Sequence, residues 1–271
     1  MPMSLVLVRH SESEHNVVQQ ADKHDRPLPA NAPAVLARHD SQQRLSTEGR
    51  RMAAVAGDWL RTNGLDPVAF DLRLVSPFLR CLESAKIMAP DVMWLPSRRV
   101  VERDWGIFGT LPDDERAERF ADTEAMKEAS SFFARFDGGE SIFDTTFRVE
   151  ALLGSLDREQ GDRRVIVVTH GEFMWATRAV IELLMPDEWQ ALDADRSLRI
   201  ANCCVLEFER RCPFGTGEVA RSLSSGWRRM TDPVHPERSP YGGEWVRLPG
   251  KRPLGAAEIG LLLDKAPPLL R

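Results

Sequence analysis

Residues 5–16 read LVLVRHSESEHN, so that an apolar run leads directly into Arg9 and His10. Such a run is typical of a buried β-strand. A buried strand normally stops at a turn-forming residue such as glycine, proline, asparagine or aspartate, rather than at an arginine and a histidine. The stretch therefore predicts a strand whose carboxyl end presents reactive side chains to a ligand.

The same pattern returns at residues 163–172, which read RRVIVVTHGE. A β-branched run ends there in His170, and a helical pattern follows at residues 172–185. In an open α/β sheet, ligands collect at the carboxyl ends of the strands, so we expect His10 and His170 to face one cleft. The helix N-termini behind them would direct backbone N–H groups and positive dipole ends into that cleft, which favours an anion.

Two arginines extend this predicted anion site. Arg9 stands beside His10, and Arg80 lies one turn into the helix expected after a second strand at residues 70–76. A guanidinium offers a planar fork of N–H donors that matches the oxygens of a phosphate. Two such forks together with two imidazoles suit a phosphate better than a carboxylate.

The rest of the chain alternates short apolar runs with longer helical periods, which is typical of an α/β fold. Further helices are expected at residues 46–61, 77–89, 112–135 and 141–156, and further strands at residues 91–96 and 202–209. We predict a three-layer α/β/α sandwich with a mostly parallel sheet.

Two segments stand apart from this alternation. Residues 20–44 are polar and contain several prolines, which predicts an inserted loop or lid. Beyond residue 210 the chain is rich in proline, with a hairpin expected near residues 242–248. We predict one domain over residues 1–210 that carries the insertion, and a C-terminal extension over residues 211–271 packed on the same domain.

Composition and charge exclude several classes of protein. A chain of 271 residues with 42% hydrophobic residues fits a soluble globular protein, and its net charge of −5 argues against a nucleic-acid binder, which is usually basic. No apolar stretch approaches the ~20 residues needed to cross a bilayer, and the N-terminus lacks the basic region of a secretion signal. The 4 cysteines form no C-x-x-C pair, so we expect buried thiols in a reducing cytoplasm.

The motifs around these residues resemble those of the histidine phosphatase superfamily, in its phosphoglycerate mutase-like branch. The resemblance runs in colinear order over about residues 4–208, through LVRHSESEHN, RLSTEGRRMA, VSPFLRCLESA, VERDWGIFG, GGES and VVTHGE. It implies a phosphoglycerate mutase-like fold and catalysis through a phosphohistidine intermediate.

The resemblance also implies roles for the strand-end residues. His10 attacks phosphorus and becomes phosphohistidine, while Arg9, Arg80 and His170 hold the three transferring oxygens. A neutral imidazole is nucleophilic at physiological pH, and a covalent intermediate divides one difficult step into two easier ones. Since fixed arginines stabilise the charge on the transferring oxygens, we expect neither a metal nor a cofactor.

Three further residues complete the site that the resemblance implies. Ser13 and Asn16 line the phosphate pocket, although the same side chains could simply cap the first helix. Glu102, in VERDWG, protonates the leaving oxygen and later activates water, which requires that desolvation outweigh its cationic neighbours. The chain departs from the family pattern at Ser11, where the family usually has a glycine that permits close backbone approach or positive φ.

The sequence thus predicts a metal-independent phosphatase that hydrolyses a small phosphorylated metabolite. Phosphoglycerate mutases, the nearest alternative, carry a tyrosine, a lysine and an arginine pair soon after the acid glutamate, and residues 107–120, IFGTLPDDERAERF, do not reproduce that set. A non-catalytic protein that binds a phosphorylated ligand is a third option, with Ser11 as its only sequence support. The substrate and the oligomeric state stay open, with a homodimer as one option.

Overall fold

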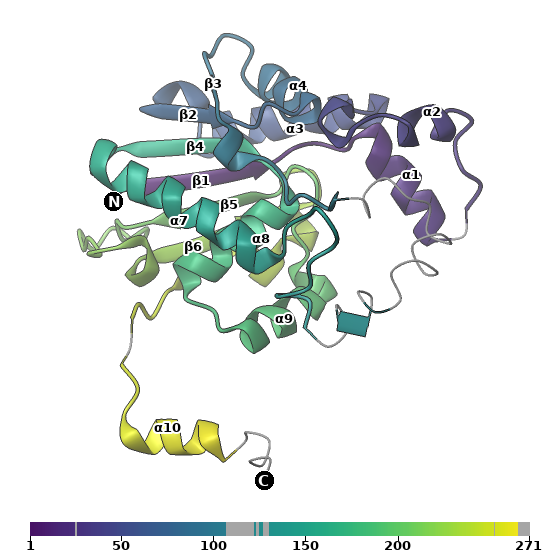
Figure 1. Ribbon diagram of the computed structural model, residues 1–271. Helices are drawn as coiled ribbons and strands as arrows, with labels where there is room; N and C mark the ends of the chain where they lie inside the picture. The colour runs from purple at the N-terminus through teal and green to yellow at the C-terminus, as the bar shows by residue number, and fades with distance from the viewer. Residues whose placement is uncertain (25, 107–121, 123–124, 127–129, 252, 265–271) are drawn as a thin grey trace.

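The computed structural model describes residues 1–24, 26–106, 122, 125–126, 130–251 and 253–264. One sheet of seven strands, in the order β3-β2-β4-β1-β5-β6-β7, runs through this part of the chain. Helices lie on both of its faces (Figure 1). The predicted three-layer α/β/α sandwich is therefore confirmed.

The described part of the chain contains the following strands and helices. The strands are β1 (Ser4–Arg9), β2 (Leu72–Val75), β3 (Leu95–Pro96), β4 (Arg164–Thr169), β5 (Val205–Glu209), β6 (Trp227–Thr231) and β7 (Val246–Arg247). The helices are α1 (Glu14–Lys23), α2 (Ala32–Leu36), α3 (Thr47–Thr62), α4 (Leu79–Met88), α7 (Ile142–Glu159), α8 (Gly171–Glu182), α9 (Pro186–Ala194) and α10 (Ala256–Leu263). Two 3-10 turns lie near the site, η1 (Asp40–Gln42) and η3 (Arg98–Val100).

Alternate residues of β1 point into two separate hydrophobic cores. Leu5 and Leu7 share one core with residues of α7 and α8, whereas Val6 and Val8 share the other with residues of α3 and α4. Successive side chains of a strand point to opposite faces, so a strand that is apolar at every position must be covered on both. The uninterrupted apolar run of β1 thus accounts for its central place in the sheet.

The sheet is mixed, so the predicted mostly parallel arrangement holds for only part of it. β3, β2, β4 and β1 are parallel neighbours, whereas β5, β6 and β7 each run antiparallel to the preceding strand in the sheet order. Antiparallel neighbours do not need the long crossover helix that parallel ones require. The sequence patterns predict no strand at β6, because its sequence WRRMT carries two adjacent arginines, of which Arg228 is buried beside Glu182.

Most helices begin where the sequence predicts. Ser46 caps α3, and Ser141 caps α7 through a capping box, as expected. Pro77, expected inside the first turn of α4, instead precedes Phe78, the N-cap of that helix. The helix expected at residues 112–135 lies largely outside the described residues.

Both segments that stand apart in the sequence contain regular structure. The predicted insertion at residues 20–44 is not only a loop, because it holds the end of α1, the short α2 and η1. Beyond residue 210 the chain adds β6 and β7 to the same sheet, while α10 lies away from the sheet and its helices (Figure 1). None of the described helices has the length and apolar character to span a membrane.

Candidate active site

The carboxyl ends of the central strands β1 and β4 bring the two strand-end histidines together. The two strands pair in parallel with Arg9 opposite Thr169, so that His10 and His170 follow at the same edge of the sheet. The centroids of the two imidazole rings lie 5.1 Å apart, with the ring planes at 65°. Both residues are almost completely buried.

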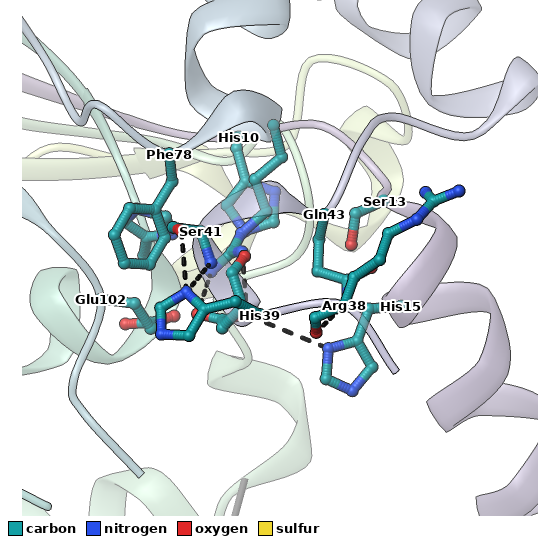
Figure 2. A network of polar contacts seen from close by, with 12 residues as sticks. His10, Ser13, His15, Arg38, His39, Ser41, Gln43, Phe78 and Glu102 are labelled. Atoms are coloured by element: carbon teal, nitrogen blue, oxygen red, sulfur yellow. Dashed lines mark hydrogen bonds and ion pairs between the residues drawn. The ribbon is translucent and has the colours of Figure 1, made fainter. Parts of the chain in front are cut away.

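A cavity of about 780 Å³ opens at this edge of the sheet. Six of the seven side chains that the sequence predicts for the site line it, namely Arg9, His10, Ser13, Asn16, Arg80 and Glu102. Figure 2 shows His39 of the insertion segment beside His10, Phe78 and Glu102, and the same residues line the cavity. The cavity therefore has a floor built from the strand ends and an outer wall that includes the insertion.

The hydrogen bonds of His10 define the protonation of its ring. Nδ1 lies 2.7 Å from the backbone carbonyl of Ser11, which can only accept, so Nδ1 carries the proton. Nε2 lies 3.1 Å from Nε of Arg80, which can only donate, so Nε2 carries the lone pair. Burial, followed by the charges of Arg80 and Arg9, holds the pKa of His10 well below its ordinary value. His10 is thus a neutral imidazole whose nucleophilic nitrogen is Nε2.

His170 is completely buried and is not among the residues that line the cavity. Its Nε2 is 2.8 Å from the hydroxyl of Ser76 and 3.3 Å from Sγ of Cys81. Burial, with Arg80 as the next cause, lowers the pKa of His170 well below its ordinary value. A contact between His170 and a phosphate stays a prediction, because the ring is not among the groups that line the cavity.

The two arginines differ in how their donors are used. Arg9 Nη1 donates to the carbonyl of Ile200 at 2.5 Å, whereas its buried Nε has no hydrogen-bond partner within the described part of the chain. Arg80 is 5% exposed and donates through every side-chain nitrogen, to His10 and to Asp40. A buried guanidinium nitrogen without an acceptor is costly, and Nε of Arg9 lies next to Gly171. Both arginines line the cavity, where their positive charge favours an anion.

Glu102 combines a raised pKa with an anchored carboxyl group. Its Oε1 accepts hydrogen bonds from the backbone N–H groups of Arg103, Glu172 and Phe173 at 3.1, 3.2 and 3.3 Å. Burial, assisted by the neighbouring Glu172, raises the pKa of Glu102 to about 7 against the opposing charges of Arg80 and Arg9. Because Oε1 already accepts three N–H groups, a proton on this carboxyl group resides on Oε2.

Arg148 of α7, which the sequence does not single out, holds the segment that carries Glu102. Its guanidinium donates to three backbone carbonyls at 3.1 to 3.2 Å, those of Arg99, Val101 and Glu102. It also contacts both carboxylate oxygens of Glu140, at 2.8 and 2.7 Å. Arg148 therefore fixes the backbone of the segment that contains Glu102. The sequence holds no signal for this role, because an arginine on an amphipathic helix usually faces solvent.

A group of polar side chains supports the backbone of His10. Ser13 and Asn16 cap α1 reciprocally, since Asn16 N donates to Ser13 Oγ at 3.2 Å and Ser13 N donates to Asn16 Oδ1 at 3.1 Å. Asn202 Nδ2 donates to the carbonyl of His10 at 3.0 Å and to Asn16 Oδ1 at 3.3 Å. The next residue, Cys203, has a φ of 64°, a value that is rare outside glycine. The capping role of Ser13 and Asn16 is therefore present, and both still face the cavity.

The serine that follows the nucleophile is accommodated without strain. Ser11 does not have a positive φ, and its hydroxyl donates to the carbonyl of Gly49 at 2.6 Å. Gly49 supplies the close approach instead, because a Cβ there would lie 1.9 Å from the carbonyl oxygen of Glu12. The turn of α3 that faces the nucleophile loop therefore has no room for a side chain at residue 49.

We expect Gly49→Ala to destabilise the protein by about 3 kcal/mol, because the new methyl group would overlap backbone atoms that cannot move independently. The free energy of unfolding, measured with urea, checks this. Gly154→Ala is the matched control, since only the mobile Nη1 of Arg158 lies near its Cβ, at 3.6 Å. That helical substitution should stabilise by about 0.5–1 kcal/mol. Equal effects at the two positions would contradict the close packing assigned to Gly49.

Comparisons with known proteins identify relatives of this chain. A family model described as the histidine phosphatase superfamily (branch 1) matches residues 5–214. A 2,3-bisphosphoglycerate-dependent phosphoglycerate mutase of Methylocella silvestris is 28% identical over 197 residues, which cover 69% of this chain and 84% of the relative. The residues that the family model matches include Arg9, His10, Arg80 and His170.

Solved structures share the fold at lower identity. A mycobacterial glucosyl-3-phosphoglycerate phosphatase in complex with inorganic phosphate has a TM-score of 0.57 and 20% identity, covering 76% of this chain and 88% of that one. A structure titled mycobacterial hydrolase 2 has a TM-score of 0.60 and 17% identity, covering 97% of each chain. These likenesses concern the arrangement of the backbone.

Proposed function

This chain belongs to the histidine phosphatase superfamily (branch 1), and from that premise we propose that it is a metal-independent phosphatase that hydrolyses a small phosphomonoester. The observation that supports this proposal best is the state of His10. Its ring is neutral, its lone pair is on Nε2, and this residue shares one cavity with two arginines and a carboxyl group whose pKa lies near 7. A nucleophile, fixed positive charge and a proton donor are the three components that phosphoryl transfer to a histidine needs.

In the first step, His10 Nε2 attacks phosphorus and the bond to the leaving oxygen breaks. Arg9, Arg80 and His170 hold the transferring oxygens in this proposal, with Ser13 and Asn16 beside them. Their N–H groups stabilise the negative charge that spreads over those oxygens in the transition state. The proton on Glu102 moves to the leaving oxygen, so that an alcohol rather than an alkoxide departs.

In the second step, a water molecule attacks the phosphohistidine from the side that the alcohol has left. Glu102, now a carboxylate, accepts a proton from this water, the bond between phosphorus and Nε2 breaks, and inorganic phosphate forms. The cycle returns Glu102 to its protonated form and His10 to its neutral form. A pKa of about 7 suits a group that must donate a proton in one step and accept one in the next.

Hydrolysis is proposed in preference to a mutase reaction because of the segment after the acid. Residues 107–120 do not reproduce the set of a tyrosine, a lysine and an arginine pair that mutases carry there, since they contain no tyrosine and no lysine. The segment lies outside the described residues. The names of the relatives include both chemistries, since the Methylocella silvestris relative is a mutase and the structure in complex with inorganic phosphate is a phosphatase. We also propose that residues 1–210 form the catalytic domain and that residues 211–271 extend it, with β6 and β7 continuing its sheet.

Turnover of p-nitrophenyl phosphate and of a panel of phosphorylated metabolites, assayed in EDTA, tests the proposal. A phosphatase releases inorganic phosphate under these conditions at a rate that added Mg²⁺ does not raise. Isomerisation of phosphoglycerate that depends on a bisphosphate primer would instead identify a mutase. Phosphate binding without either activity would identify the chain as a non-catalytic protein that binds a phosphorylated ligand. A requirement for a divalent cation would contradict the metal-independent mechanism.

A further inference from the structure

The insertion segment places a carboxylate directly on the arginine that is proposed to hold the phosphate. Asp40 begins η1, and its Oδ1 and Oδ2 accept hydrogen bonds from Arg80 Nη1 and Nη2 at 2.9 and 3.0 Å. The backbone carbonyl of Asp40 accepts from Nη1 as well, at 2.6 Å. The guanidinium fork is thus filled by a two-oxygen anion of the same chain, in the bidentate geometry that a phosphate would use.

The third side-chain nitrogen of Arg80, Nε, contacts the nucleophile His10. Arg80 Nε donates to the lone pair of His10 Nε2 at 3.1 Å, which is the lone pair that must reach phosphorus. The guanidinium therefore joins Asp40 on one side to His10 on the other. While this bridge is intact, the fork cannot hold a phosphate and the nucleophile is hydrogen-bonded rather than free to attack.

The two partners of this ion pair differ in how easily they can move. The side chain of Arg80 is 6% exposed, whereas that of Asp40 is 42% exposed. Asp40 lies in a three-residue turn on the cavity wall, so its carboxylate can turn outward into water. Nδ1 of His15, also on the cavity wall, lies 4.0 Å from Oδ1 of Asp40 and offers an alternative polar neighbour. Asp40 is accordingly the partner that an incoming anion displaces.

On the basis of the function proposed above, we propose that Asp40 determines the affinity of the site for phosphate by competing with the substrate for Arg80. Every phosphate that binds must replace the carboxylate on the guanidinium fork and then remain near a negative charge. Asp40 thereby weakens the binding of substrate and of inorganic phosphate alike. The same competition helps product to leave, because the carboxylate returns to the fork as phosphate departs.

Titration of the full-length protein with inorganic phosphate, followed by isothermal calorimetry, tests this role. Asp40→Asn keeps the size of the side chain, removes its charge and replaces one oxygen by an NH₂ group. Asp40→Ser also removes the charge and shortens the side chain. We expect both variants to bind phosphate about tenfold more tightly than the wild type, because the competing anion is gone. The KM for p-nitrophenyl phosphate should fall by a similar factor, without a matching rise in kcat, because release of phosphate becomes slower.

Asp58→Asn is the matched control. It removes the same charge from an exposed site on α3 where the carboxylate pairs with Arg61, and its affinity for phosphate should equal that of the wild type. If the wild type binds phosphate and both Asp40 variants bind it equally or more weakly, the role proposed for Asp40 is wrong, while the proposed phosphatase function is unaffected. Absence of phosphate binding by the wild type would instead remove the proposed phosphatase function, and the two failures are thus distinguishable.

Discussion

Replacing His10 by alanine should reduce phosphatase turnover by a factor on the order of 10⁵ or more, the scale of loss seen when a nucleophile is removed. The expectation follows from the ring state, since Nε2 of this neutral imidazole holds the lone pair that forms the bond to phosphorus. Arg9 and Arg80 stay in place in the variant, so inorganic phosphate should still bind. A steady-state assay with p-nitrophenyl phosphate and a phosphate titration measure the two effects separately.

His235→Ala provides the control for this substitution, because it removes a surface imidazole whose charged neighbour is Glu237. It should turn over at the wild-type rate. Brief mixing with labelled substrate and quenching in base should trap phosphoprotein in the wild type and none in His10→Ala, since phosphohistidine survives base and decays in acid. Labelled protein in the alanine variant would place the nucleophile elsewhere.

The part of the site that could be predicted is the part encoded by local pattern. An apolar run that ends in a histidine identifies both strand ends, and the rule that ligands collect at the carboxyl edge of a parallel sheet brings His10 and His170 together. Arg80 could be predicted in the same way, because it lies in the first turn of the helix that follows the second strand. Each of these positions depends on residues adjacent to it in the chain.

The contacts that could not be predicted join segments that are distant in the sequence. Asp40 lies in a polar, proline-containing stretch where an exposed carboxylate is the ordinary expectation, and nothing local indicates that it meets Arg80. Asn202 reaches the carbonyl of His10 from the turn before β5, across a large separation in the sequence. Such contacts arise from tertiary packing, which a pattern of neighbours does not record.

The serine at position 11 is a departure from the family pattern whose local geometry could not be predicted from the sequence. A glycine in that position was expected to be needed for close approach of the backbone, and its loss was the only sequence support for a catalytically silent protein. In the structure Ser11 does not have a positive φ, and its hydroxyl donates to the backbone carbonyl of Gly49, 38 residues away in the sequence. This contact is visible only when the facing segment is known.

Glu102→Gln should slow turnover of substrates with poor leaving groups by about 10²–10⁴-fold, the usual contribution of general acid catalysis. An alkyl phosphate needs a proton on its leaving oxygen, whereas p-nitrophenolate departs readily without one. The loss in kcat/KM should therefore be much larger for the alkyl ester. The glutamine oxygen can still accept the N–H groups of Arg103, Glu172 and Phe173, so the fold of the loop is retained.

The raised pKa of Glu102 also predicts how the rate changes with pH. Burial raises the pKa of Glu102 to about 7, so the protonated form that donates to the leaving oxygen is lost as pH rises through that value. For an alkyl phosphate, kcat/KM of the wild type should fall above about pH 7, and this limb should be absent in Glu102→Gln. At a pH above the ordinary carboxyl pKa, a carboxyl group whose pKa is raised in the folded state ionises more readily in the unfolded chain, which opposes folding. Replacing Glu102 by glutamine removes this effect. Glu102→Gln should therefore be no less stable than the wild type at pH 8.

Glu237→Gln serves as the control, because this carboxylate is exposed on the surface beside Arg238 and should leave both the rate and the pH profile unchanged. Measurement of kcat/KM for an alkyl and an aryl phosphate between pH 5 and 9 then separates a proton donor from a residue that only shapes the cavity. A purely structural role would slow both esters equally and would keep the alkaline limb. Selective loss of the alkyl ester together with loss of that limb requires a proton that moves from Oε2 of Glu102 to the leaving oxygen.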